Sequence, residues 1–188
     1  MKKITLTTIF ALLVAMGVSA QNLIGIKGGF NSAVEYGENE YGKSGSTGAR
    51  IGLHFGFFLE SPIGNKVDIQ PELVYSMQGA DGDGSTDKFD YINFPLIFKI
   101  YVNQPRSFSI DVGPQVGYLL SAKIVKGSIT RDIMSEMNRL DAALCVGISY
   151  KINDNFHLGL RYNVGLTKLV DRLENRNGVA QIGIGYKF

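Results

Sequence analysis

The segment best suited to binding a metal ion is the acidic run DGDGSTD at residues 81–87. Three carboxylates lie within seven residues, and carboxylate oxygens are ligands that Ca²⁺ prefers in proteins. The run departs from the EF-hand loop, because Ser85 occupies the fifth position and Thr86 stands where that loop needs glycine. We therefore expect a solvated surface loop from Asp81 to Asp87, with calcium binding as the alternative, and no cofactor or metal site.

A catalytic site would have to use the few nucleophiles and bases that the chain offers. Acyl hydrolysis needs a serine or similar nucleophile within reach of a base, and the two histidines are His54 and His157. Both fall on the polar side of alternating segments, where hydrogen bonding inside the fold is the simpler interpretation. The single cysteine, Cys145, falls on the same side and cannot pair within the chain. The sequence predicts a protein that is not an enzyme, with an inert, buried thiol.

Charged side chains of both signs also lie on this polar side, at alternate positions. We expect them to form an interior cluster of Glu60, Asp68, Glu72, Lys99, Asp111, Lys151, Arg161 and Lys187. Opposite charges enclosed in a narrow interior form salt bridges, because an unpaired buried charge is costly. The prediction is a closed, salt-bridged plug. The functional alternative is a narrow path for ions between the same side chains.

Eight segments of alternating apolar and polar residues would position these side chains. They span residues 23–32, 48–60, 66–78, 89–102, 108–120, 139–151, 156–166 and 178–188. Their connections are long and short in turn, so that all long loops fall at one end, as in outer-membrane barrels. Within the longest loop, Ile133, Met134 and Met137 recur at helical spacing behind Thr130, which predicts a short helix over residues 130–137.

The direction of the two faces decides the fold class. A soluble carrier barrel needs an apolar cavity and a wet exterior, but here the charged groups would have to fill the cavity. In lipid the same pattern is stable, because a closed sheet satisfies every backbone group while apolar side chains meet acyl chains. The sequence therefore predicts an all-β protein, an eight-stranded antiparallel up-and-down transmembrane β-barrel, with its apolar face outward.

The first twenty residues carry the marks of a secretory signal peptide. Lys2 and Lys3 precede an uncharged, mostly apolar run that ends in small residues, which predicts cleavage near Ala20–Gln21. Residues 21–188 would then form one barrel domain in the outer membrane of a Gram-negative cell. Cleavage removes two of the 19 basic residues and leaves 17 to balance the 17 acidic ones, so no nucleic-acid partner is expected.

Several motifs resemble the small outer-membrane β-barrels of the porin-family or PorT-like group found in Bacteroidetes-type bacteria. They are IQPELVYSMQG (69–79), YINFPLIFK (91–99), DVGPQVGYLL (111–120), LRYNVGLTKL (160–169) and the terminal IGIGYKF. The alternating terminal residues also look like the signal that barrel-assembly machinery recognises. That signal would consist of Ile182, Ile184, Tyr186 and Phe188. The resemblance implies an outer-membrane barrel but no particular activity, and it points to secretion machinery as a class of partner.

Two classes of function fit these patterns. The first is a non-enzymatic integral barrel with a structural, adhesive or accessory role in an envelope assembly, in which the long loops carry the specificity. Its expected partners are outer-membrane lipid, the barrel-assembly machinery and an envelope protein bound through the loops. The second is a narrow, porin-like channel for small solutes or ions. A measurement of ion conductance would distinguish these two classes of function.

Overall fold

The computed structural model describes residues 23–38, 44–82, 84–170 and 174–188. The expected signal peptide and its cleavage site lie outside this part of the chain. Eight strands are long, namely β1 (Leu23–Glu38), β3 (Gly48–Pro62), β4 (Val67–Gly82), β5 (Ser85–Tyr101), β6 (Phe108–Lys126), β8 (Leu140–Lys151), β9 (Phe156–Gly165) and β10 (Arg176–Lys187). Two are short, namely β2 (Ser44–Ser46) and β7 (Ile129–Asp132). Within the described ranges, no helix is long and apolar enough to span a membrane.

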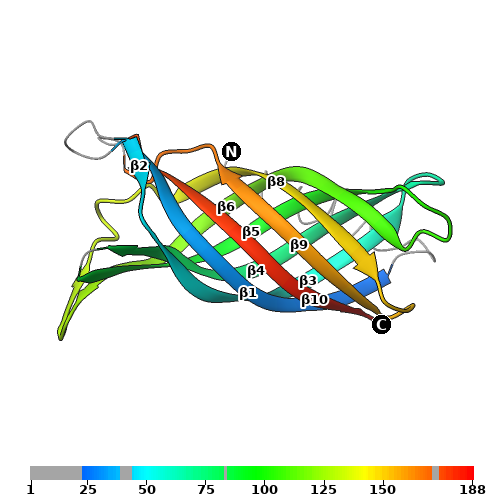
Figure 1. Cartoon of the computed structure of the whole chain (residues 1–188), viewed down its shortest axis with the longest axis horizontal. Coiled ribbons are helices and arrows are strands. Elements are labelled where there is room, and N and C mark those ends of the chain that lie inside the picture. The colour runs from blue at the N-terminus through cyan, green and yellow to red at the C-terminus, as the bar shows by residue number, and fades with distance from the viewer. Residues whose placement is uncertain (1–22, 39–43, 83, 171–173) are drawn as a thin grey trace, which may run out of the picture.

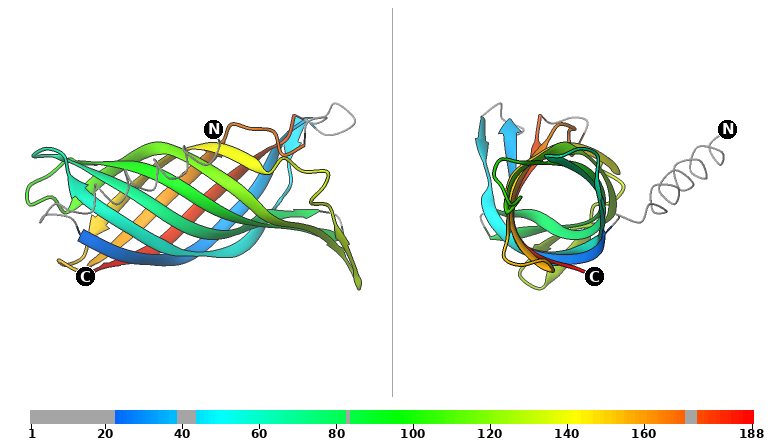
Figure 2. Two further views of the ribbon diagram at one scale, coloured as in Figure 1. Left: turned by 180° about the vertical axis from the view of Figure 1, so that it is seen from behind. Right: turned by 90° about the vertical axis from the view of Figure 1, so that its right-hand side faces the viewer.

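The eight long strands close into an antiparallel barrel (Figure 1). Each long strand pairs with the next long strand along the chain, and β10 pairs with β1 from Gly25 opposite Lys187 to Tyr36 opposite Arg176. The end-on view in Figure 2 shows the resulting ring. Closure leaves no open edge around the wall, which is what a sheet needs in order to lie in lipid. The predicted fold is confirmed.

Several strands continue past their predicted ends and project beyond the barrel wall (Figures 1 and 2). The expected loop at residues 79–88 is instead a hairpin, in which β4 reaches Gly82 and β5 begins at the paired Ser85. The helix expected over residues 130–137 is wrong. Residues 129–132 form β7, which pairs with the end of β6, because the β6 ladder offers their backbone groups partners that an isolated short helix would lack.

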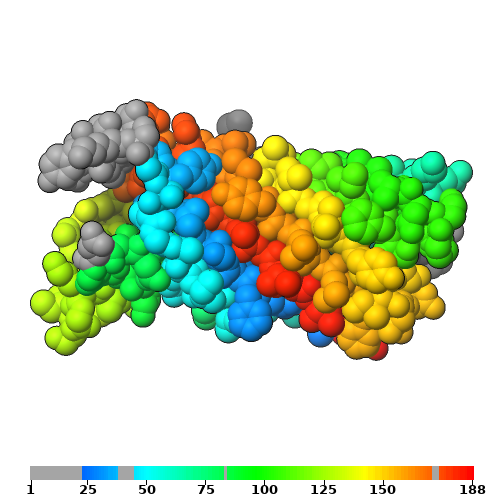
Figure 3. Space-filling view, viewed as in Figure 1, coloured from blue at the N-terminus to red at the C-terminus, as the bar shows by residue number. Residues whose placement is uncertain are grey.

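The two faces of the wall are oriented as the alternation predicts. Large apolar side chains point outward along the strands, and Phe30 and Phe57 are 60% and 61% exposed. Figure 3 shows the continuous outer surface that β1, β10, β9 and β8 form on one side. The buried side chains of the lumen are mostly polar or charged. The interior is therefore where the predicted charge cluster must be sought.

Candidate functional site

The middle of the lumen is crossed by an ion triad centred on Glu72. Lys27 Nζ lies 3.0 Å from Glu72 Oε2, and the Arg161 guanidinium donates two hydrogen bonds of 2.8 Å to the same carboxylate. Gln70 Nε2 donates a further bond of 2.6 Å to Glu72 Oε1. These residues lie on β1, β4 and β9, and Lys27, Glu72 and Arg161 are 14%, 0% and 9% exposed in their side chains. The triad therefore joins separate parts of the wall across the lumen.

A second ion cluster lies nearer the short-turn end. Glu60 on β3 pairs with Lys99 Nζ at 3.0 Å and with Lys187 on β10. All three carboxylate and ammonium groups are buried. The Glu60 carboxylate thus ties β3 to both β5 and β10.

The short turn before β6 supplies a third ion pair. Arg106 donates a hydrogen bond to Asp68, and its guanidinium lies 4.3 Å from the ring centroid of Tyr101. Arg106 was not expected at the site, because a turn residue has no place in the strand alternation. Lys27, by contrast, stands at a regular inward position beside Ile26, so its position on the polar face was readable from the sequence.

Two further residues of the predicted cluster, Asp111 and Lys151, do not join these ion clusters. Asp111 is buried and accepts hydrogen bonds from Ser109 Oγ (2.6 Å) and from Ser149. Lys151 is a correction to the prediction, because its side chain is 40% exposed and pairs with Asp154 at 2.7 Å outside the buried cluster. It is the last residue of β8, where the wall ends. The hydrogen bond from Lys151 lowers the pKa of the exposed Asp154 carboxyl.

On the long-loop side of the triad, a polar network surrounds Asn31. Its amide nitrogen donates 2.9 Å hydrogen bonds to Ser76 Oγ and to the Met77 carbonyl, and its Oδ1 accepts one from Gln181. His54 Nδ1 lies 2.8 Å from the same oxygen. His54 is therefore a partner in an interior network, as the simpler interpretation held.

The second histidine and the cysteine lie apart from this network. The His157 ring meets Phe58 edge-on at 5.4 Å between centroids. Cys145 is buried, with its sulfur 3.7 Å from Gln115 Oε1. Neither contact resembles a nucleophile held by a base.

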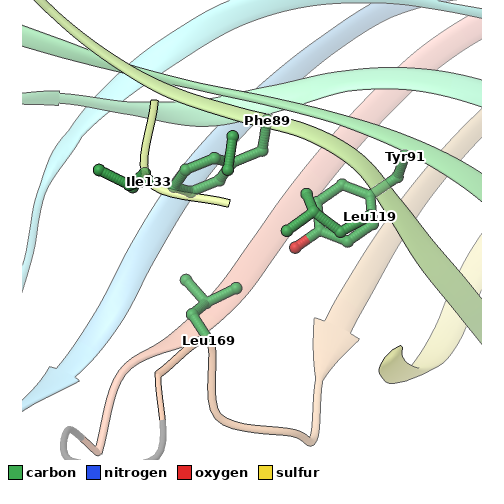
Figure 4. Close-up of a cluster of buried hydrophobic side chains, with 6 residues drawn as sticks. Phe89, Tyr91, Leu119, Ile133 and Leu169 are labelled. Carbon is green, nitrogen blue, oxygen red and sulfur yellow. The ribbon is translucent and has the colours of Figure 1, made fainter. Parts of the chain in front are cut away.

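A cluster of mostly apolar side chains lies at the long-loop end of the lumen, although the alternation of the sequence predicts a polar interior. Figure 4 shows the loop residues Ile133 and Leu169 directed toward residues of β5 and β6. The buried members are Phe89, Tyr91, Leu119, Ala122, Ile133 and Leu169, and we call them the apolar plug. The two loops are joined by a 2.8 Å hydrogen bond from Asn138 N to the Leu169 carbonyl.

Two cavities border the charged groups of the lumen. A cavity of about 30 Å³ lies beside the triad and is bordered by Lys27, His54, Asp111 and Arg161, among others. This is room for one or two water molecules. A larger cavity of about 430 Å³ opens at the short-turn end next to Glu60 and Arg106. Between that mouth and the apolar plug lie the Glu60 cluster, the Glu72 triad and the polar network of Asn31.

The acidic hairpin has no cluster suited to a metal within the part that the structure describes. Asp81 and Asp87 lie on paired strands, opposite Thr86 and Ala80, and Asp83 is not among the described residues. The described residues contain no group of three or more His, Cys, Asp or Glu side chains placed to hold an ion.

The residues expected to form an assembly signal face the outside of the wall at the end of β10. Ile182, Ile184 and Phe188 are 55%, 46% and 69% exposed. The Tyr186 ring contacts Phe156 and Phe188 at centroid distances of 4.9 and 5.3 Å. An aromatic group thus lies at the short-turn rim, where barrels carry interfacial girdles.

Comparison with known proteins places this geometry in context. A family described as outer membrane protein beta-barrel domain matches residues 19–171. No curated protein matches. Neisserial surface protein A shares 15% identity over 88% of this chain and 97% of its own, with a TM-score of 0.63. The attachment invasion locus protein Ail of Yersinia pestis shares 17% identity over 89% and 99%, with a TM-score of 0.53. At these identities the likeness concerns the fold alone.

Proposed function

The chain belongs to the family of outer membrane protein beta-barrel domains, and on that premise we propose that it is a non-conducting, non-enzymatic barrel of the outer membrane. It acts through the strands and loops that extend beyond the wall, as an adhesive surface or as an accessory to an envelope assembly. The narrower PorT-like resemblance adds secretion machinery as a class of partner. Export of the chain requires the expected signal peptide.

The buried ion clusters and the apolar plug inside the lumen are the observation that supports this proposal. The Glu72 triad lies in the middle of the lumen, the Glu60 cluster lies toward the short turns, and the apolar plug lies at the long-loop end. A diffusing ion would have to separate buried pairs and then pass the apolar plug, in which the Tyr91 hydroxyl is the polar group, and both steps are costly. The lumen therefore supports structure better than transport.

The extended strands supply the surface on which a partner could bind. The β4–β5 and β6–β7 hairpins project beyond the wall at the long-loop end, which in such barrels faces outward from the cell. All four residues of β7 are exposed, and among the described strands β7 pairs with β6 alone. Ile129 at the start of β7 is 71% exposed on a hairpin away from the apolar wall. The unpaired edge of a strand offers backbone groups with which another chain can pair.

A narrow channel is the second candidate, and one observation favours it. The cavity at the short-turn end is wide and bordered by charged residues, as the entrance to an ion path would be. Conductance distinguishes a blind entrance from a path.

Site-specific photo-crosslinking on intact cells tests the binding surface. A photoreactive amino acid at Ile129 should give a partner adduct at least tenfold more abundant than the same amino acid at Ile63. Ile63 is a matched control, because it is also exposed (57%) but lies in the turn between β3 and β4 at the other end. Adducts formed only from position 63 would place the partner on the periplasmic side and contradict the proposal.

A further inference from the structure

The outer wall of the barrel carries a groove near the short-turn end. Its volume is about 230 Å³. Two rows of outward side chains border it. One row is Phe108, Tyr150 and Leu158, and the other is Ile148, Leu160 and Ile182. Between the rows, Ser149 pairs with Gly159, and the backbone of this pair forms the floor.

The chemistry of the groove is almost wholly apolar. Of the six side chains along its walls, only Tyr150 carries a polar atom. The walls stand on paired strands, so the groove is formed before any ligand arrives. An extended hydrocarbon chain matches such a shape, because many weak dispersion contacts along a rigid wall add up.

The position of the groove selects the leaflet. Phe108 is the first residue of β6, Leu158 is the third of β9, and Tyr150 is the last but one of β8. All three therefore adjoin short turns, which face the periplasm in barrels of this kind. A chain lying there would belong to a lipid of the periplasmic leaflet.

We infer that this groove binds one acyl chain of a glycerophospholipid from the periplasmic leaflet and holds it in place longer than the surrounding lipid. The inference rests on the outer-membrane location in the proposed function. A second copy of the chain is a poorer occupant, because a stable protein interface takes about 20 to 30 residues a side, whereas six side chains border this groove.

Native mass spectrometry of the full barrel, extracted from phosphatidylethanolamine and phosphatidylglycerol vesicles into mild detergent, tests the inference. The wild-type barrel should retain one phospholipid. In Leu160→Trp the larger side chain occupies the groove, and the lipid-bound fraction should fall at least tenfold. Leu144→Trp is the matched control, since Leu144 is also an outward residue on this side of the wall (42% exposed against 49%) but lies outside the groove. It should retain lipid as the wild type does.

Equal retention by the wild type and Leu160→Trp, or no retained lipid in any of the three proteins, would overturn the inference. A retained second copy of the chain in place of lipid would also overturn it. If Leu160→Trp does not fold, a phospholipid with a diazirine in its acyl chain can be used on the wild type. Labelling should then concentrate on Tyr150, Leu158 and Leu160, and uniform labelling of the wall would count against the groove. Neither result alters the conductance expected of a closed lumen, so the two proposals can fail separately.

Discussion

Replacing Glu72 with glutamine should lower the free energy of unfolding by about 3 to 5 kcal/mol, the usual cost of breaking a buried ion pair from one side. The glutamine keeps the shape of the side chain but removes the charge that Lys27 and Arg161 share. Both cations then remain in the lumen without a counter-charge. Urea titration of the barrel folded in phospholipid vesicles measures the change. Because the chain contains no tryptophan, the folded fraction is best followed by gel mobility without heating.

A matched substitution separates burial from charge. Glu136→Gln breaks the pair with Arg131, which has a similar separation of 2.5 Å but side chains that are 67% and 55% exposed. Exposed pairs are worth about 0 to 1 kcal/mol, so this variant should unfold close to the wild type. Equal losses from Glu72→Gln and Glu136→Gln would contradict the assignment of the triad as the central brace of the lumen.

Gly113→Ala should destabilise the barrel by about 1 to 3 kcal/mol, the range for added bulk in a packed interior. A Cβ at Gly113 would overlap the carbonyl oxygen of Leu96 on the neighbouring strand β5. Backbone cannot move aside as a flexible side chain can, so the β5–β6 ladder must shift. The same urea titration measures the loss.

Gly159→Ala is the control for this prediction. A Cβ at Gly159 has Ser149 Oγ as its nearest neighbour at 3.7 Å, an ordinary contact. Alanine also restricts the unfolded chain, so this variant should match the wild type or gain up to about 1 kcal/mol. If both alanines had the same effect, close approach of the strands at Gly113 would not be the cause.

The architecture was readable from the sequence because a two-residue period and an abundance of charge on one face leave few stable solutions. Glu60, Glu72 and Lys99 all stand at alternating positions, and each is buried in the lumen. The alternation does not predict which charged residues pair with each other. Glu72 meets Lys27 and Arg161 because the wall curves β1 and β9 toward β4, and curvature is a property of the closed sheet rather than of any one strand.

The ends of the barrel were the least predictable part. Phe89 and Tyr91 interrupt the polar face, and their reason appears only when Ile133 and Leu169 fold onto them from two loops far apart in the sequence. The sequence did not predict β7 within one of these loops, because the pairing of β7 depends on how far β6 extends. At the other end, Lys151 leaves the expected cluster because the strand stops there.

Current recording across a planar bilayer tests the closed lumen most directly. Purified wild-type barrel, shown to be folded by gel mobility, should insert without steady unitary currents at moderate voltage, because buried ion pairs and the apolar plug leave no continuous aqueous path. Steady unitary currents from the wild type, altered or abolished by Glu72→Gln or by Arg161→Gln, would show that ions pass the triad and would contradict the account.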